Sequence, residues 1–197
     1  MIAIIDSGGA NIASVQFALE RLGATSVLTQ DVSVIQSADR VLLPGVGAAP
    51  VAMRTLRDAN LIECIRQLRQ PVLGICLGMQ LLFSHSDEGN TDLLGVLEGR
   101  CTAFTPAPGR AVPHMGWNSL QQVASHPLMA GVPTSSHVYF VHSFFVPASD
   151  TTIAACDYGD RFTAIAAHKN FMGCQFHPER SGQVGAQILK NFLEMPS

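Results

Sequence analysis

The first half of the chain alternates short apolar segments with amphipathic ones, and this alternation constrains the fold most. Each apolar segment has the length of a buried strand, and each is followed by residues with apolar positions at helical spacing. One amphipathic segment, NIASVQFALERLG, ends at Gly23, a typical helix stop. Strands alternating with helices form βαβ units, in which helices cover both faces of a parallel sheet. The strand-length segments are MIAIID, SVLTQ, RVLLPG and PVLGIC.

From about Leu94 the pattern changes to short apolar runs separated by turn residues, which predicts antiparallel hairpins. The segments YGDR and HKNFMG are typical hairpin connections. The chain of 197 residues closes with an amphipathic helix in SGQVGAQILKNFLEM, and its 47% hydrophobic content suffices for one core. We therefore expect a single α/β domain over residues 1–197. Its sheet should be open, mixed and largely parallel, flanked by helices, with antiparallel hairpins in the C-terminal half.

Composition argues against several classes of function. Only 14% of the residues are charged, the net charge is −3 and there is no basic block, so nucleic acid is not an expected partner. The apolar runs are too short for a membrane span, and the N-terminus lacks the charge pattern of a secretory signal. The five cysteines are scattered without CxxC spacing, which favours reduced thiols in the cytoplasm. No metal site or cofactor is predicted, because His137 and His142 lack further ligands at useful spacing.

The segment PVLGICLGMQLLF places Cys76 between Gly74 and Gly78. If a strand ends here and a helix begins, Cys76 lies at the edge of the sheet where ligands bind in open α/β folds. The pattern is the cysteine form of the nucleophile elbow G-x-S-x-G. The helix N-terminus would stabilise a thiolate, and the Leu77 N–H would donate to an oxyanion. An inert core cysteine is the alternative, and the pentapeptide alone does not decide between them.

A thiol nucleophile needs a base and a group that orients the base. His177 follows the apolar run FMGCQF, so it lies at another strand end, where it can meet the elbow. Glu179 comes two residues later, close enough for one loop to present both side chains to the same cleft. A strand-end histidine beside a solvated glutamate is the alternative. Together with the elbow, the pair favours a Cys–His–Glu triad.

Three segments in this order resemble motifs of the class I, triad-type glutamine amidotransferases: LLPGVGA (42–48), GICLGMQ (74–80) and QFHPE (175–179). The resemblance covers essentially the whole chain. It implies that L-glutamine is hydrolysed to glutamate and ammonia. Cys76 would be the nucleophile, His177 the proton carrier and Glu179 the residue that orients it. The N–H groups of Leu77 and Val46 would form the oxyanion hole.

The same resemblance implies a set of residues that bind glutamine. Each has a simpler alternative: a plain turn after the third strand, a polar helix residue, a solvated loop or an alternating strand. We also expect the Pro44–Gly47 segment to be a switch, with its donor misaligned until a partner binds, since glycine accepts positive φ. The predicted substrate-binding residues are Gly45, Gly47, Gln80, Glu88, His142, Ser143 and Phe144.

Further segments, including PHMGWNSL, YFVHSF and HPERSG, resemble the branch of the family that serves histidine biosynthesis. That branch implies a heterodimer with a cyclase subunit, a (β/α)₈ barrel through which ammonia passes. Ser7 and Ala10 depart from the family, which has a tyrosine and a glycine there, in a segment near the partner interface. Simpler alternatives for the interface residues are a half-buried hairpin tryptophan and a solvated arginine. The predicted interface residues are Asn11, Pro113, His114, Met115, Trp117, Asn118, Tyr139 and Arg180.

Other functions remain open at this point. The glutaminase could feed anthranilate, aminodeoxychorismate, GMP, carbamoyl phosphate or pyridoxal phosphate synthesis. A cysteine peptidase or γ-glutamyl hydrolase on the same scaffold would need an open cleft and no obligate partner. A regulatory or chaperone-like domain without enzymatic activity would have lost Cys76, His177 or Glu179, and all three are present.

Overall fold

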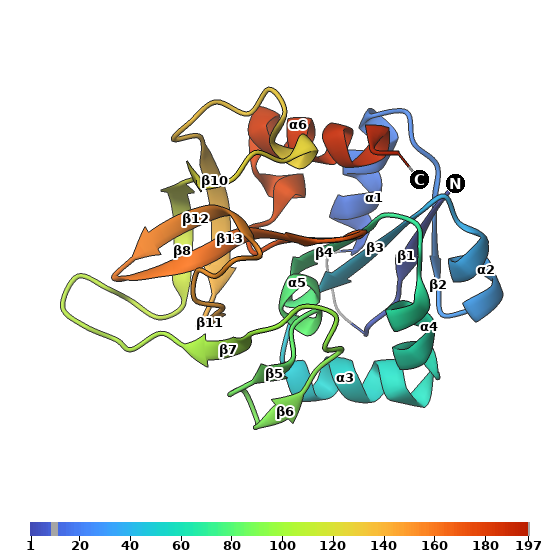
Figure 1. Cartoon of the computed structure of the whole chain (residues 1–197), viewed down its shortest axis with the longest axis horizontal. Coiled ribbons are helices and arrows are strands. Elements are labelled where there is room, and N and C mark those ends of the chain that lie inside the picture. The colour runs from blue at the N-terminus through green and yellow to red at the C-terminus, as the bar shows by residue number, and fades with distance from the viewer. Residues whose placement is uncertain (9–11, 197) are drawn as a thin grey trace.

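The computed structural model describes residues 1–8 and 12–196, which are built around an eight-stranded sheet (Figure 1). Four neighbouring pairs, from β2 to β14, are parallel, and the remaining three are antiparallel. The predicted mixed, largely parallel sheet is therefore confirmed. In spatial order its strands are β2 (Ser26–Thr29), β1 (Ile2–Ile5), β3 (Arg40–Gly45), β4 (Val72–Cys76), β14 (Phe171–Cys174), β13 (Asp160–His168), β12 (Thr152–Tyr158) and β9 (Gln121–Gln122).

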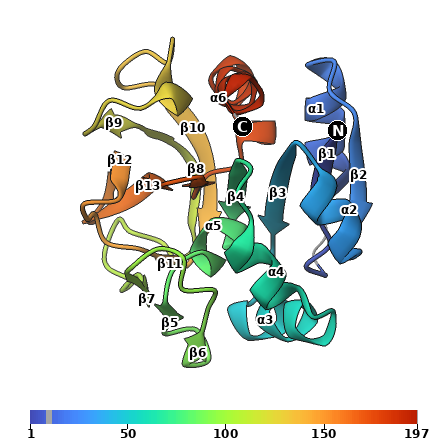
Figure 2. The same cartoon turned by 45° about the vertical axis from the view of Figure 1, so that its right-hand side comes forward.

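Helices cover both faces of this sheet (Figure 1 and Figure 2). Side chains alternate between two buried clusters along β1: Ile2 and Ile4 pack with α1 and α6, while Ala3 and Ile5 pack with the other helices. Because both faces are covered, the central strands β1, β4 and β14 are buried, continuous apolar runs. The helices are α1 (Ile12–Arg21) and α6 (Gly182–Glu194) on one face, and α2 (Val32–Ser37), α3 (Ala49–Asp58), α4 (Leu61–Gln67) and α5 (Leu77–Leu81) on the other.

Two small sheets and two 3₁₀ turns complete the described structure. The predicted hairpin at YGDR joins β12 to β13, with Gly159 at φ 76°, and HKNFMG joins β13 to β14. No helix in the described part of the chain is long and apolar enough to cross a membrane. The remaining elements are the pair β8 (His114–Ser119) and β10 (His137–His142), the sheet β11 (Phe144–Phe145), β7 (Arg100–Ala103), β5 (His85–Ser86) and β6 (Thr91–Asp92), and the turns η1 (Pro127–Met129) and η2 (Pro178–Arg180).

The carboxyl ends of three adjacent strands meet at one edge of the large sheet. Gly45 at the end of β3 lies opposite Cys76 at the end of β4, and Cys174 at the end of β14 lies opposite Ile75. The residues that follow these strands are therefore neighbours in space, although they are distant in sequence. This edge is where open α/β sheets bind their ligands.

Candidate active site

Cys76 occupies the strand-to-helix turn that the sequence predicted. It is the last residue of β4, and α5 begins at Leu77. Its backbone has φ 54° and ψ −112°, in the region that glycine favours and other residues rarely adopt. Such strain persists only where the surrounding structure enforces it, and it concentrates at functional sites. The turn places Cys76 at the carboxyl edge of the sheet, buried beside a cavity.

The glycines around Cys76 let three backbone segments approach one another. A Cβ atom at Gly78 would lie 1.7 Å from the carbonyl oxygen of Leu43, and one at Gly74 would lie 2.6 Å from the carbonyl oxygen of Gly78. A Cβ atom at Gly45 would lie 2.8 Å from the Gly78 nitrogen. The start of α5 is therefore pressed against β3 and β4. No larger side chain fits at these positions without moving the turn.

His177 and Glu179 form a buried pair beside this turn. Glu179 Oε1 accepts a hydrogen bond from His177 Nδ1 at 2.8 Å, and the two side chains are 5% and 1% exposed. This bond fixes the tautomer of the ring and leaves Nε2 as the ring nitrogen on the side away from Glu179. Burial lowers the pKa of His177, but interactions with Cys76 and Glu179 outweigh burial and raise it to about 10. The site therefore favours the protonated, imidazolium form of His177.

A cavity of about 330 Å³ opens beside the thiol. It brings together most of the residues predicted to act on the substrate, from five separate parts of the chain. Glu179 lies behind His177, and Gly45 lies one residue before the part of the β3 loop that reaches the cavity. The lining residues are Val46, Gly47, Cys76, Leu77, Gln80, Glu88, Pro113, Val141, His142, Ser143, Phe144 and His177.

The predicted oxyanion segment follows β3. Val46 and Leu77 face the same cavity, and Gly47 has φ 92°, a conformation that requires glycine or costs strain. The buried Ser7 hydroxyl donates to the Pro44 carbonyl at 2.8 Å, so the loop after β1 supports this segment. Ser7 is one of the two positions that depart from the family pattern. That the segment switches on partner binding stays a prediction.

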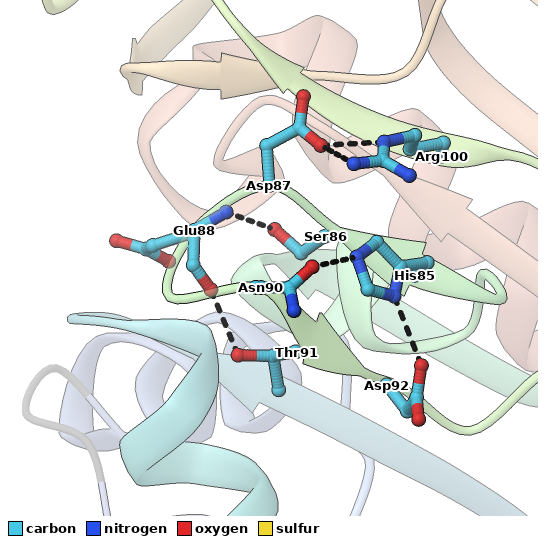
Figure 3. Close-up of polar contacts among 8 residues, drawn as sticks. All are labelled: His85, Ser86, Asp87, Glu88, Asn90, Thr91, Asp92 and Arg100. Atoms are coloured by element: carbon cyan, nitrogen blue, oxygen red, sulfur yellow. Dashed lines mark hydrogen bonds and ion pairs between the residues drawn. The ribbon is translucent and has the colours of Figure 1, made fainter.

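Glu88 reaches the cavity from a loop held by its own polar contacts (Figure 3). Its N–H donates to Ser86 Oγ at 3.1 Å, and its carbonyl accepts from the Thr91 hydroxyl at 2.8 Å. The carboxylate points away from the pair formed by His85 and Asp92, and Oε2 accepts from the Ala49 N–H at 2.7 Å. The loop therefore fixes the carboxylate at the start of α3, where the helix dipole favours a negative charge.

These features match a known family. The family model described as glutamine amidotransferase class-I matches residues 3–195. The chain belongs to the class I glutamine amidotransferases. The imidazole glycerol phosphate synthase subunit HisH of Xanthomonas axonopodis pv. citri (strain 306) is 53% identical over 194 residues, which are 98% of this chain and 97% of that protein. The protein of the same name from Xylella fastidiosa (strain Temecula1 / ATCC 700964) has the same identity and coverage.

Solved structures share the fold of this glutamine amidotransferase. A crystal structure of a glutamine amidotransferase aligns with a TM-score of 0.75 at 19% identity, covering 98% of this chain and 97% of the other. PurLQS from Thermotoga maritima aligns with a TM-score of 0.71 at 18% identity, covering 98% and 96%. At these identities the likeness establishes the architecture alone, and it confirms the predicted fold class.

In this amidotransferase the pocket wall opposite Glu88 is held by a buried histidine pair. His142 donates from Nδ1 to the Phe144 carbonyl at 2.8 Å, and its Nε2 lies 3.1 Å from His114 Nδ1. His114 stacks on Tyr158 with ring centroids 3.9 Å apart. Burial lowers the pKa of His114 to about 4 and that of His142 to about 3. Both rings are therefore neutral at pH 7, and each acts as one donor and one acceptor.

This pair is expected to make the fold sensitive to acid. Because both folded-state pKa values lie below the ordinary value of 6.5, the unfolded chain binds more protons below pH 6.5. The contribution of the neutral pair to the free energy of unfolding is therefore present above pH 6.5. It is lost as the pH falls toward the folded-state pKa values of about 4 for His114 and about 3 for His142. Urea unfolding should show that the pair accounts for about 3 kcal/mol of stability lost between pH 6.5 and 5.0. His142→Gln should remove about half of this loss, and the exposed His137→Gln should not; an unchanged pH dependence in His142→Gln would contradict the assignment.

The residues predicted to contact a partner lie mainly on β8, β10 and η2. Met115 is 61% exposed and Trp117 57% exposed on β8. Trp117 meets Tyr139 edge-on, and the Arg180 guanidinium lies 4.8 Å above the Tyr139 ring. These four side chains make up an apolar and cationic surface, in which Met115 lies two residues before Trp117 on the same face of β8. We call it the β8 surface.

The other predicted interface residues are placed less uniformly. Pro113 is exposed and also lines the cavity, and Asn118 is half-buried with a hydrogen bond to the Asp157 carbonyl at 3.0 Å. His114 differs from its neighbours on β8, because its ring is only 3% exposed and packs inside the molecule. Its side chain therefore supports the pocket wall rather than the outer surface. Asn11 and Ala10 lie outside the described residues.

Sequence reasoning missed one buried polar side chain in the site. Gln175 is fully buried between Gln80 and Cys76. It precedes His177 by two residues in the motif QFHPE, so its presence there was the available signal. Its contacts depend on β14 lying beside β4, which the sequence pattern does not specify.

Proposed function

We propose that this chain is the glutaminase subunit of imidazole glycerol phosphate synthase, an enzyme of histidine biosynthesis. One observation carries the proposal. A strained cysteine and a histidine bound to a buried glutamate side chain line one cavity, in a chain that is 53% identical over 98% of its length to a curated subunit of that synthase. The substrate is L-glutamine, and the products are glutamate and ammonia.

In the first step the Cys76 thiolate attacks the carbon of the glutamine side-chain amide. The carbonyl oxygen becomes an oxyanion, stabilised by the Leu77 N–H and by the Val46 N–H once that segment is aligned. His177 gives its proton to the amide nitrogen, the C–N bond breaks and ammonia leaves. A glutamyl thioester remains on Cys76.

In the second step a water molecule attacks the thioester. His177, now neutral, takes a proton from the water, the C–S bond breaks and glutamate leaves. The thiolate–imidazolium pair is restored, with Glu179 holding the ring throughout. Gln80, Glu88 and the His142–Phe144 segment are the groups that bind and orient glutamine in this proposal.

Ammonia must leave the site without being protonated in bulk water. We therefore place a cyclase subunit with a (β/α)₈ barrel over the β8 surface, forming a heterodimer in which ammonia enters the barrel. There it reacts with a phosphoribulosyl-formimino aminoimidazole nucleotide to give imidazole glycerol phosphate. Large aromatics beside an arginine are typical anchors of such interfaces. The five free cysteines support a cytoplasmic location.

The test measures glutamate release from L-glutamine by the purified chain alone, with the cyclase subunit, and with that subunit and its nucleotide ligand. Activity should be low alone and rise strongly when both partner and nucleotide are present. Equal activity with and without the partner would favour a free-standing hydrolase. No activity under any condition would exclude a glutaminase.

Two surface variants locate the partner in the same experiment. Trp117→Ala removes the exposed aromatic of the β8 surface and should weaken partner binding by about 30-fold or more, as expected for a central interface aromatic. Leu28→Ala is the control, because Leu28 is also exposed but lies on the edge strand β2 at the other end of the sheet. Binding measured by titration calorimetry should be unchanged in Leu28→Ala. Equal binding by both variants would place the interface elsewhere.

A further inference from the structure

Gln175 is a buried polar residue that the mechanism above does not use. It follows β14 and is fully buried. Its Oε1 accepts a hydrogen bond from Gln80 Nε2 at 2.9 Å, and its Nε2 lies 3.9 Å from Cys76 Sγ. It therefore joins a residue on the substrate cavity to the reacting sulfur.

The orientation of the Gln175 amide is determined by its neighbours. A backbone carbonyl can only accept hydrogen bonds, so the Phe144 carbonyl requires that Gln80 present its NH₂ group, at 2.8 Å. The same NH₂ group faces Gln175, which must therefore present its oxygen to Gln80. The remaining NH₂ group of Gln175 then has to face Cys76.

The Phe144 carbonyl is itself fixed from the opposite side. Asn118 donates from Nδ2 to the Asp157 carbonyl at 3.0 Å, and the same NH₂ group lies 3.3 Å from His114 Nε2. His114 must then carry its proton on Nδ1 and donate to His142 Nε2, so His142 carries its proton on Nδ1 and donates to Phe144. The hydrogen bonds thus run in one direction from β8 to Phe144, and none of them allows the Gln80 and Gln175 amides to flip.

Cys76 has different partners for its two protonation states. The protonated thiol can donate to the Val141 carbonyl, which lies 3.7 Å from Sγ. The thiolate cannot donate, and the side-chain N–H of Gln175, the residue after β14, then donates to it. Hydrogen bonds to an ionised group are roughly twice as strong as neutral ones, so this contact should tighten when the sulfur ionises.

We propose that Gln175 stabilises the Cys76 thiolate by donating its side-chain N–H to the sulfur, in an orientation set by Gln80 and the Phe144 carbonyl. The proposal rests on the proposed function, in which Cys76 is the nucleophile. It assigns Gln175 an effect on the ionisation of the thiol, which a residue that only fills space would not have.

The test is the pH dependence of alkylation of Cys76 by iodoacetamide, followed by mass spectrometry of the peptide that contains it. Gln175→Leu keeps the approximate volume and removes the donor. The midpoint of the pH profile should rise by about one pH unit, because a hydrogen bond to the charged form is lost. At pH values well below the wild-type midpoint, alkylation should then be about tenfold slower. Gln70→Leu is the matched control: the Gln70 amide donates to the Ile35 carbonyl on α2, and its loss should not move the midpoint.

A second variant keeps the proposal testable if Gln175→Leu does not fold. Gln80→Met leaves Gln175 in place but removes the group that orients it, so the midpoint should rise by a smaller amount. If wild-type Cys76 does not react in preference to the four other buried cysteines, the proposed function itself is overturned. If wild-type Cys76 reacts preferentially and the folded variants keep its midpoint, only the role of Gln175 is overturned.

Discussion

Replacing Cys76 by alanine is expected to lower kcat for glutamine hydrolysis by about 10⁴- to 10⁶-fold, as removal of a covalent nucleophile does in other enzymes. The thioester cannot form without the sulfur, and His177 alone does not provide an equivalent nucleophile. Alanine at this position keeps the strained backbone, with φ near 54°, so the variant should fold as well as the wild type. Glutamate release with the cyclase subunit and its nucleotide ligand gives the rate.

Cys64→Ala is the control for this substitution. Cys64 lies on α4 in the buried cluster on the α3–α4 face of the sheet, and burial raises the pKa of its thiol. Its removal should cost stability but leave kcat unchanged. A glutamyl adduct on the Cys76 peptide in wild-type protein, absent from Cys76→Ala, would identify the intermediate directly. Activity within tenfold of wild type in Cys76→Ala would exclude the proposed mechanism.

The elements that could be predicted from the sequence are those with an apolar pattern that extends over several consecutive residues. The segment RVLLPG predicted a strand, and β3 spans the same six residues, because a strand buried on both faces must be apolar throughout. The helix NIASVQFALERLG corresponds to α1, although Phe17 is exposed rather than packed against the sheet. Apolar spacing identifies the helix, but burial depends on what covers each face.

Short or polar elements left no comparable signal. The helix α2 has six residues, and β5 and β6 have two residues each, so none is long enough for its hydrophobic pattern to repeat twice. Their positions depend on contacts with distant segments, such as the parallel pairing of His85 with Arg100. The burial of His114 has the same origin, since it depends on stacking against Tyr158.

The candidate site contains one part that a local sequence pattern predicts and another that depends on contacts between distant segments. The elbow around Cys76 was predictable because its glycines and its cysteine lie within five residues. The sequence placed His177 at a strand end, but only the structure shows that this strand, β14, lies directly beside β4. That adjacency brings His177 and Gln175 to the thiol, and nothing in the local sequence encodes it.

Glu179→Gln should test the carboxylate of the proposed triad. The amide oxygen can still accept the hydrogen bond from His177 Nδ1, so the ring should keep its tautomer, but the negative charge is lost. That charge helps to raise the pKa of His177. Without it the imidazolium is less stable, and kcat at pH 7 should fall by about 100-fold, within the range for a weakened general acid–base.

The pH profile separates this effect from simple disruption of the pocket. The imidazolium is present below the pKa of His177 and is lost as the pH rises through that value, which is about 10 in the wild type. Burial alone lowers this pKa, so removing the Glu179 charge should move the alkaline limb of the kcat/KM profile to lower pH. Glu63→Gln is the control, because Glu63 lies exposed on α4 and pairs with Arg66. If the alkaline limb of Glu179→Gln coincides with that of Glu63→Gln, the Glu179 charge does not support the imidazolium, and the triad reduces to Cys76 and His177.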